Sequence, residues 1–261
     1  MNKITTIIDK EWAEVFRNKL VLFSVIFLPL ILLALPILTV WGMSNFETDM
    51  SNEVPADILG TSCVGMSESE CVIFYMLSIY TLLFMILPVM IPITIAAYSI
   101  VGEKTTRSLE PILATPITST ELLLGKAFAA VIPAVVVSWI AYIIYAISTI
   151  IMLPDMDVIP FFLDPTWLVA IFVVGPLLTI FAVCAAIMVS SRVTDPRSAE
   201  QLAGLVVLPI ILLLMGQSMG LILISKELVF LIGLIVAVLD AILVYLVVKT
   251  FHRETILTHW K

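Results

Sequence analysis

Six long apolar stretches constrain the fold of this chain more than any other feature of its sequence. They cover residues 20–43, 72–101, 127–153, 167–190, 202–224 and 229–248. A helix needs about 20 apolar residues to cross the hydrocarbon core of a bilayer. The stretches are continuously apolar rather than alternating, which favours helices over the strands of a membrane barrel. We therefore expect a single domain over residues 1–261, an all-α integral membrane protein with six spans.

The composition excludes several functions. The chain is 61% hydrophobic and 13% charged, whereas soluble domains carry roughly 25% charged residues. The sequence contains neither a basic nucleic-acid patch nor a soluble segment long enough for an ATPase domain. We expect the lipid bilayer as its surroundings and no nucleic acid as a partner.

The basic residues predict the orientation of the six spans. With a cytoplasmic N-terminus, every lysine and arginine except Lys226 falls on the cytoplasmic side, as the positive-inside rule requires. We expect a multi-pass protein of the plasma membrane with both termini cytoplasmic, residues 249–261 forming a tail. The outer loops are strongly acidic, which fits either a solvated loop surface or a field that attracts cations.

A few isolated residues invite a chemical role. Cys63 and Cys71 share the predicted outer loop, where an oxidising environment permits a disulfide. A zinc site there would be incomplete because no histidine is near, so no metal is expected. Asp240 is the one ionisable residue deep within a span. We expect it to be a hydrogen-bonded group between helices, and a proton or cation contact is the alternative.

Gly216 and Gly220 flank a serine in a pattern that resembles a nucleophile elbow. That motif needs a histidine within reach, and the two histidines of the chain lie in the C-terminal tail. We therefore expect no catalytic residue here. The two glycines instead suit a close helix contact or a break in the helix that forms a re-entrant element.

The segments predicted to lie in the cytoplasm carry the most information. Residues 1–19 contain an amphipathic stretch with Trp12 on its apolar side, typical of a helix lying in the membrane interface. After the second stretch, Glu103 and Arg107 are spaced i, i+4, and Arg107 and Glu110 are spaced i, i+3, so one helical face holds a charge ladder. Thr118 and Glu121 form a capping-box pattern that predicts the next helix start.

These segments resemble the type-2 ABC exporter permease family. The resemblance is carried by Trp12–Lys19, Glu103–Lys126, Ser198–Gly204 and residues 251–254, in the family's order along nearly the whole chain. The segment Glu103–Lys126 is the most specific part. Ser108 departs from the pattern, which has a glycine there.

The resemblance implies a six-helix permease that pairs with an identical or related permease and binds two cytoplasmic ABC ATPase subunits. ATP and magnesium would be bound by the ATPase, so this chain would need no cofactor of its own. In the family, the segment between spans two and three is a coupling helix seated on the ATPase. By position, docking falls on Glu103, Lys104, Arg107, Leu109, Glu110 and Leu113, with weaker contacts from Trp12, Arg17, Arg192, Asp195 and Arg197.

The implied mechanism is ATP-driven closure of the two ATPases, which would open the permease interface outward along the second and fifth spans. An apolar pathway suits a hydrophobic or amphipathic substrate, such as a lipid, a peptide or a drug-like molecule. The composition alone equally allows a self-contained six-helix channel or a lipid-handling membrane protein that needs no ATPase.

Overall fold

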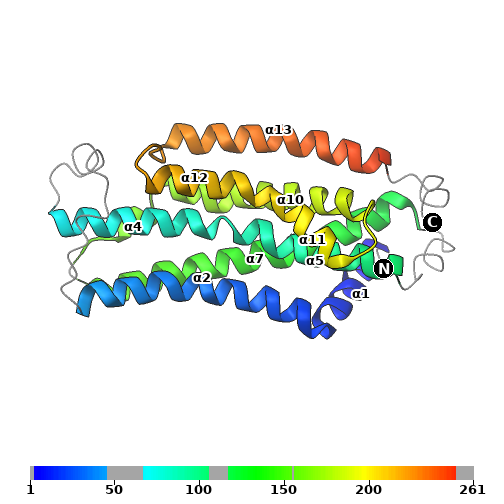
Figure 1. The fold of residues 1–261 in the computed structure, drawn as a ribbon, viewed down its shortest axis with the longest axis horizontal. Helices are drawn as coiled ribbons and strands as arrows, with labels where there is room; N and C mark the ends of the chain where they lie inside the picture. Colours follow the sequence, from blue (N-terminus) through cyan, green and yellow to red (C-terminus); the bar gives the residue numbers. More distant parts are fainter. Residues whose placement is uncertain (1–2, 46–66, 106–116, 155, 251–261) are drawn as a thin grey trace.

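The computed structural model describes all residues except 1–2, 46–66, 106–116, 155 and 251–261. The described residues form helices and short connections, and no strand occurs among them. Six helical segments long and apolar enough to cross a membrane lie side by side along the molecule (Figure 1). The expected all-α membrane fold with six candidate spans is therefore confirmed.

The helices follow one another along the chain with the following bounds. A short helix, α1 (Lys3–Arg17), precedes the first span, α2 (Lys19–Asn45). The second span combines α4 (Glu68–Phe84) with α5 (Leu87–Thr105), and the third is α7 (Ser119–Met152). The fourth contains α8 (Ile159–Phe162), α9 (Pro165–Val169), the π-helical turn η2 (Ala170–Val174) and α10 (Gly175–Ser190). The fifth contains α11 (Pro196–Gly204), the 3-10 turn η3 (Leu205–Val207) and α12 (Leu208–Ser218), and the sixth is α13 (Lys226–Thr250).

Proline accounts for the break within the second span. Pro88 has no N–H to donate to the carbonyl of Phe84, four residues earlier, and its ring crowds that carbonyl. The chain passes through a turn at residues 85–86, where the N–H groups bond three residues back instead of four. The prolines inside α2 and α7 are accommodated within continuous helices.

The bounds of the fifth span and the start of the third helix differ from the expected ones. The fifth candidate span covers Pro196–Ser218 rather than residues 202–224, because Asp195 caps α11 and the helix ends near Gly220. Gly220 has φ 72°, a left-handed conformation that glycine adopts most easily. The third helix begins at Ser119, ahead of residue 127, with the predicted capping box of Thr118 and Glu121 in place.

The second span forms the centre of the bundle. In its most apolar part 61% of the residues are buried, compared with 17% for the sixth span. Helix α5 packs against α10, α7 and α11, whereas α13 lies along one side on α10. Helix α1 and the C-terminal end of α13 lie at the same end of the bundle, here called the α1 end (Figure 1). The opposite end, where residues 219–225 join α12 to α13, is called the far end.

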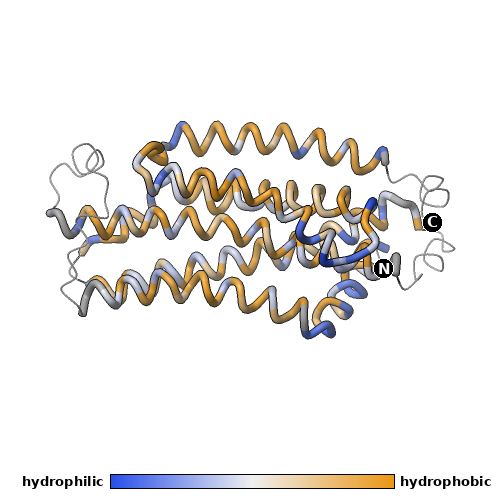
Figure 2. The backbone as a smooth tube through the Cα atoms, viewed as in Figure 1, coloured by the Kyte–Doolittle hydropathy of each residue, from blue (hydrophilic) through white to orange (hydrophobic). Residues whose placement is uncertain are grey.

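Polarity is concentrated at the α1 end. Figure 2 shows apolar residues along the spans and hydrophilic residues around α1 and α11. Among the described lysines and arginines, Lys226 alone lies at the far end. The separation of charge that the sequence predicts is therefore present in the folded chain.

Candidate functional site

The N-terminal helix α1 is packed against the bundle along one face. Ile7, Glu11 and Val15, spaced by four residues and therefore on one side of the helix, are its buried residues. The sequence predicted an amphipathic helix here, and the structure has a helix at this place, Lys3–Arg17. Its buried stripe contains a glutamate, however, which the expected arrangement of an apolar face in lipid did not include.

Helix α1 contacts the first turns of α7 closely. The indole N–H of Trp12 donates to the carbonyl of Ala129 at 3.0 Å. A Cβ atom added to Gly125 would lie 2.7 Å from Ile7 Cγ2 and 2.8 Å from Ile7 Cβ, so only glycine allows this approach. Trp12 thus anchors α1 to α7, whereas Arg17 is exposed at the end of α1.

A buried ion network joins α1, α5 and α7. The ammonium group of Lys126 donates to Glu11 Oε1 and to Ser99 Oγ, each at 2.8 Å. It also lies 2.7 Å from Glu103 Oε2, an ion-pair contact whose angle does not make a hydrogen bond. The hydroxyl of Ser99 donates to Glu11 Oε2 at 2.5 Å. The side chains of Lys126, Glu11 and Glu103 are 5%, 3% and 2% exposed, so these charges are paired inside the protein.

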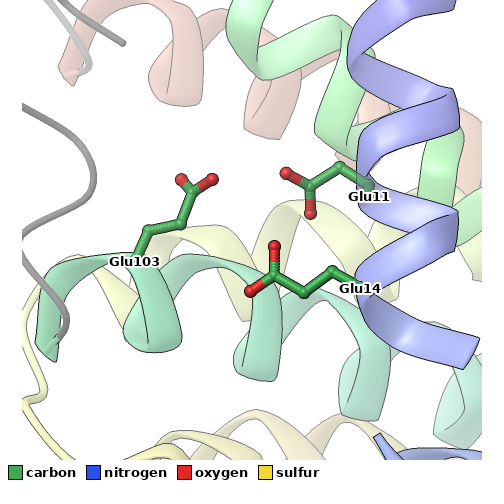
Figure 3. A group of neighbouring side chains, drawn as sticks. All are labelled: Glu11, Glu14 and Glu103. Carbon is green, nitrogen blue, oxygen red and sulfur yellow. The ribbon is translucent and has the colours of Figure 1, made fainter. Parts of the chain in front are cut away.

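Lys10 closes the network on its exposed side. Its ammonium group donates to Glu103 Oε1 and lies 3.4 Å from Glu11 and 3.6 Å from Glu14. Figure 3 shows Glu11 and Glu14 of α1 directed toward Glu103 of α5. Oxygens of these three carboxylates lie within 4.8 Å of one another, a spacing that would also suit a cation. The ammonium groups of Lys10 and Lys126 already supply the compensating charge.

The network shifts the pKa values of Glu11 and Lys10 on α1. Burial would raise the pKa of Glu11, but the charge and hydrogen bond of Lys126 hold it below its ordinary value of 4.5. Burial would lower the pKa of Lys10, but the hydrogen bond and charge of Glu103 raise it above 10.5. Both groups are therefore charged at neutral pH.

The residues expected to dock a partner are only partly described. Glu103 ends up inside the bundle in the last turn of α5, not on an exposed face, because Lys126 and Lys10 neutralise it there. Its expected role in docking an ATPase stays a prediction, and its side chain is buried rather than exposed. Lys104 belongs to α5. Arg107, Leu109, Glu110 and Leu113 lie outside the described residues.

The secondary contacts expected between spans four and five lie on the surface of the α1 end. Arg192, Asp195 and Arg197 are all exposed. Asp195 caps α11, accepting from the backbone N–H and the hydroxyl of Ser198 at 2.9 Å each. The bond from the backbone N–H lowers the pKa of Asp195 most, and the bond from the hydroxyl lowers it further. Asp195 therefore has a local structural role.

The cysteines and Asp240 complete the residues singled out in the sequence. Cys71 is disulfide-bonded and Cys184 is a free, buried thiol. Cys63 lies outside the described residues, so its pairing with Cys71 stays a prediction. Asp240 is 6% exposed, and neither of its carboxylate oxygens has a hydrogen-bond partner among the described residues. The expected hydrogen bond between helices is therefore not found.

Gly216 and Gly220 end the fifth span. The N–H of Leu221 bonds the carbonyl of Gly216 at 2.8 Å, and the N–H of Gly220 bonds that of Gln217 at 2.9 Å, a Schellman motif. A Cβ on Gly216 would meet Ile222 Cδ1 at 2.6 Å. The glycines let the chain fold back tightly, and residues 219–225 form no helix among the described residues.

Sequence reasoning missed five members of the network, namely Glu11, Lys126, Ser99, Lys10 and Glu14. The available signal was Glu11 on the apolar stripe of α1, because a buried carboxylate needs a cation nearby. A lysine directly before an apolar stretch, as at Lys126, was the matching signal.

Comparison with known proteins places the chain in a family. A family model described as "ABC-2 family transporter protein" matches residues 5–252, which include the ion network and all six candidate spans. The comparison with curated proteins finds no match. Since the family match extends over nearly the whole chain, the protein belongs to the ABC-2 family of transporter proteins, a family of membrane components of ABC transporters.

Proposed function

We propose that this chain is the permease of an ATP-driven exporter, with the α1 end in the cytoplasm. Two ABC ATPase subunits, which bind ATP and magnesium, would dock there, and a second permease copy would complete the translocation pathway. The distribution of lysine and arginine supports this orientation, because cytoplasmic segments carry an excess of basic residues.

The ion network around Lys126 is the observation that carries the proposal. Residues 106–116 connect α5 to α7, and Lys126 ties Glu103 at the end of α5 to Glu11 of α1. A displacement applied to this connection therefore reaches α1, α5 and α7 together. Because α5 packs against α7, α10 and α11, the movement would spread to the centre of the bundle. Such an arrangement suits a coupling segment, whereas a self-contained channel has no need of one.

The proposed contacts with the ATPase lie in and beside the connection. Lys104, Arg107 and Glu110 would fix the register of the coupling helix, and Leu109 and Leu113 would occupy an apolar groove on the ATPase. Glu103 would hold the base of the helix in place through Lys126. Arg192 and Arg197, exposed at the same end, are available for secondary contacts.

The proposed pathway runs between two permease copies along the second and fifth spans. The fifth span exposes large apolar side chains, among them Leu208 (50%), Leu212 (66%) and Met215 (51%). Lipid or a second copy would cover this face. A groove of about 650 Å³, lined partly by Met90 and Glu200, lies beside it. Its mixed lining suits an amphipathic substrate better than a sugar.

Charge reversal at Arg107 tests the proposal. The permease and its ATPase are reconstituted together, and ATP hydrolysis is measured alongside transport of a fluorescent phosphatidylcholine and of tetraphenylphosphonium. Arg107→Glu should reduce the transport driven by ATP about tenfold, equivalent to about 1.4 kcal/mol of coupling, by repelling Glu110. Lys249→Glu, a reversal at an exposed residue of the same end, should leave transport unchanged. Transport by the wild-type chain without any ATPase would instead favour the channel or lipid-handling alternative.

A further inference from the structure

A cavity of about 620 Å³ opens at the far end of the bundle, between α4, the α8–α9 segment, α12 and the residues that follow α12. Its volume lies in the range of small-molecule sites. Three aromatic side chains form a continuous wall. The ring of Phe161 lies 6.0 Å from that of Phe74 and 5.6 Å from that of Trp167, measured between centroids. The wall offers ring faces and edges to an apolar ligand.

One lining residue contains a buried hydrogen-bond acceptor without a donor among the described residues. The hydroxyl of Ser78 donates to the carbonyl of Tyr75 at 2.7 Å, so its oxygen accepts from Gln217 Nε2 at 2.6 Å. The hydroxyl of Tyr75 donates to the backbone carbonyl of Gln217 at 2.8 Å. These bonds fix the orientation of the amide and leave Gln217 Oε1 without a partner among the described residues. Gln217 is only 3% exposed, so these bonds hold one side of the cavity in place.

The charge of the lining is negative. Asp157 and Asp164 border the cavity, and no lysine or arginine is among its described lining residues. Asp164 Oδ1 caps α9 by accepting from the N–H of Thr166 at 2.7 Å. Its Oδ2 lies 4.0 Å from the ammonium group of Lys226, with the two side chains 39% and 67% exposed. An exposed pair at this distance is weak, so a ligand cation can displace Lys226, which does not line the cavity, from Asp164.

We propose that this cavity binds an organic cation with an apolar body, such as an ammonium or phosphonium group that carries aromatic or alkyl substituents. Carboxylates at the rim attract the charge, and the aromatic wall contacts the apolar body and stabilises the cation through the ring faces. As a release site for exported cargo the cavity rests on the proposed function, whereas the binding itself does not. A divalent metal, which prefers six or more oxygen ligands, fits the aromatic wall poorly.

Binding of tetraphenylphosphonium to the permease alone in lipid nanodiscs tests the proposal. Equilibrium dialysis measures the bound cation, and empty nanodiscs supply the lipid background. We expect saturable binding that neutral triphenylphosphine oxide does not reproduce. Asp157→Asn combined with Asp164→Asn should weaken it by about fivefold or more, the sum of two exposed charge contacts. Asparagine at 164 still carries the oxygen that caps α9, so the fold is preserved.

Matched variants separate a local site from a general surface field. Glu227→Gln removes the same charge from the far end at a residue that does not line the cavity, and it should leave the dissociation constant unchanged. Lys226→Gln removes the competing cation at the rim and should tighten binding. The proposal is overturned by an absence of saturable binding, by equal binding of the neutral compound, by equal weakening in Glu227→Gln, or by Ca²⁺ that binds in place of the organic cation. Because the assay contains no ATPase, failure to transport in the coupled system would not be mistaken for failure to bind here.

Discussion

Removing the charge of Lys126 should release α1 from the bundle. In Lys126→Met the carboxylates of Glu11 and Glu103, whose side chains are 3% and 2% exposed, would lose their buried partner. Lys10, at 44% exposure, cannot replace it for both. Breaking a buried pair by removing one partner costs about 3–5 kcal/mol. The equilibrium between docked and released α1 should therefore shift by about two to three and a half powers of ten.

Hydrogen exchange of the α1 amides in nanodiscs measures this equilibrium directly. Two variants provide the comparison. Glu11→Gln combined with Lys126→Met removes both members of one buried pair, and its loss of protection should be smaller than that of Lys126→Met alone. Lys3→Met breaks the exposed contact of Lys3 with Glu121, at 3.5 Å with 49% and 31% exposure, and should cost less than about 1 kcal/mol. Unchanged protection of α1 in Lys126→Met would refute the reasoning.

Three further changes probe the same packing and the sixth span. The contribution of Glu11 to the docking of α1 on the bundle should be complete above pH 4.5 and disappear as the pH falls through its lowered pKa. The contribution of Lys10 should be complete below pH 10.5 and disappear as the pH rises through its raised pKa. A pH titration of the α1 tryptophan fluorescence should therefore be flat between these limits. Gly125→Ala should weaken the docking of α1 by about 1–3 kcal/mol through overpacking. Because the clash involves Cγ2 and Cβ of Ile7, the double variant with Ile7→Gly should lose less docking free energy, measured by hydrogen exchange, than the sum of the two single changes. Asp240→Asn should retain transport and change stability by about 1 kcal/mol or less, since no described group pairs with its oxygens; loss of transport by an assembled variant would reveal a cation or proton contact instead.

The fold could be predicted from the sequence to a large extent because span formation depends on local composition. A continuous apolar stretch of this length is most stable as a helix in the lipid bilayer, so the six spans follow from residue types alone. The capping box of Thr118 and Glu121 is also local, and it forms as predicted. The limits of the fifth helical segment differ from the expected ones because they depend on one cap, Asp195, and one left-handed glycine, Gly220.

The candidate site could not be predicted in the same way because its contacts join distant segments. Glu11 and Lys126 are 115 residues apart, and Ser99 and Glu11 are 88 apart. The amphipathic pattern of residues 4–16 identifies a helix with one apolar face but does not say whether lipid or α7 covers it. A single glycine, Gly125, decides this by permitting close contact with Ile7, and nothing in the periodicity of α1 points to it.

A buried network of ion pairs suits helices that move together better than apolar packing of equal strength does. Apolar packing is not directional. Two helices that pack through apolar side chains can therefore rotate or slide under an applied force and keep most of their contact. In the network of Lys126, each charged group has an assigned partner, and a slip by one turn would leave buried carboxylates uncompensated. The ion network is therefore either fully formed or broken, with few intermediate arrangements. A displacement at residues 106–116 would move α1, α5 and α7 together for as long as the force stays below the cost of separating those charges.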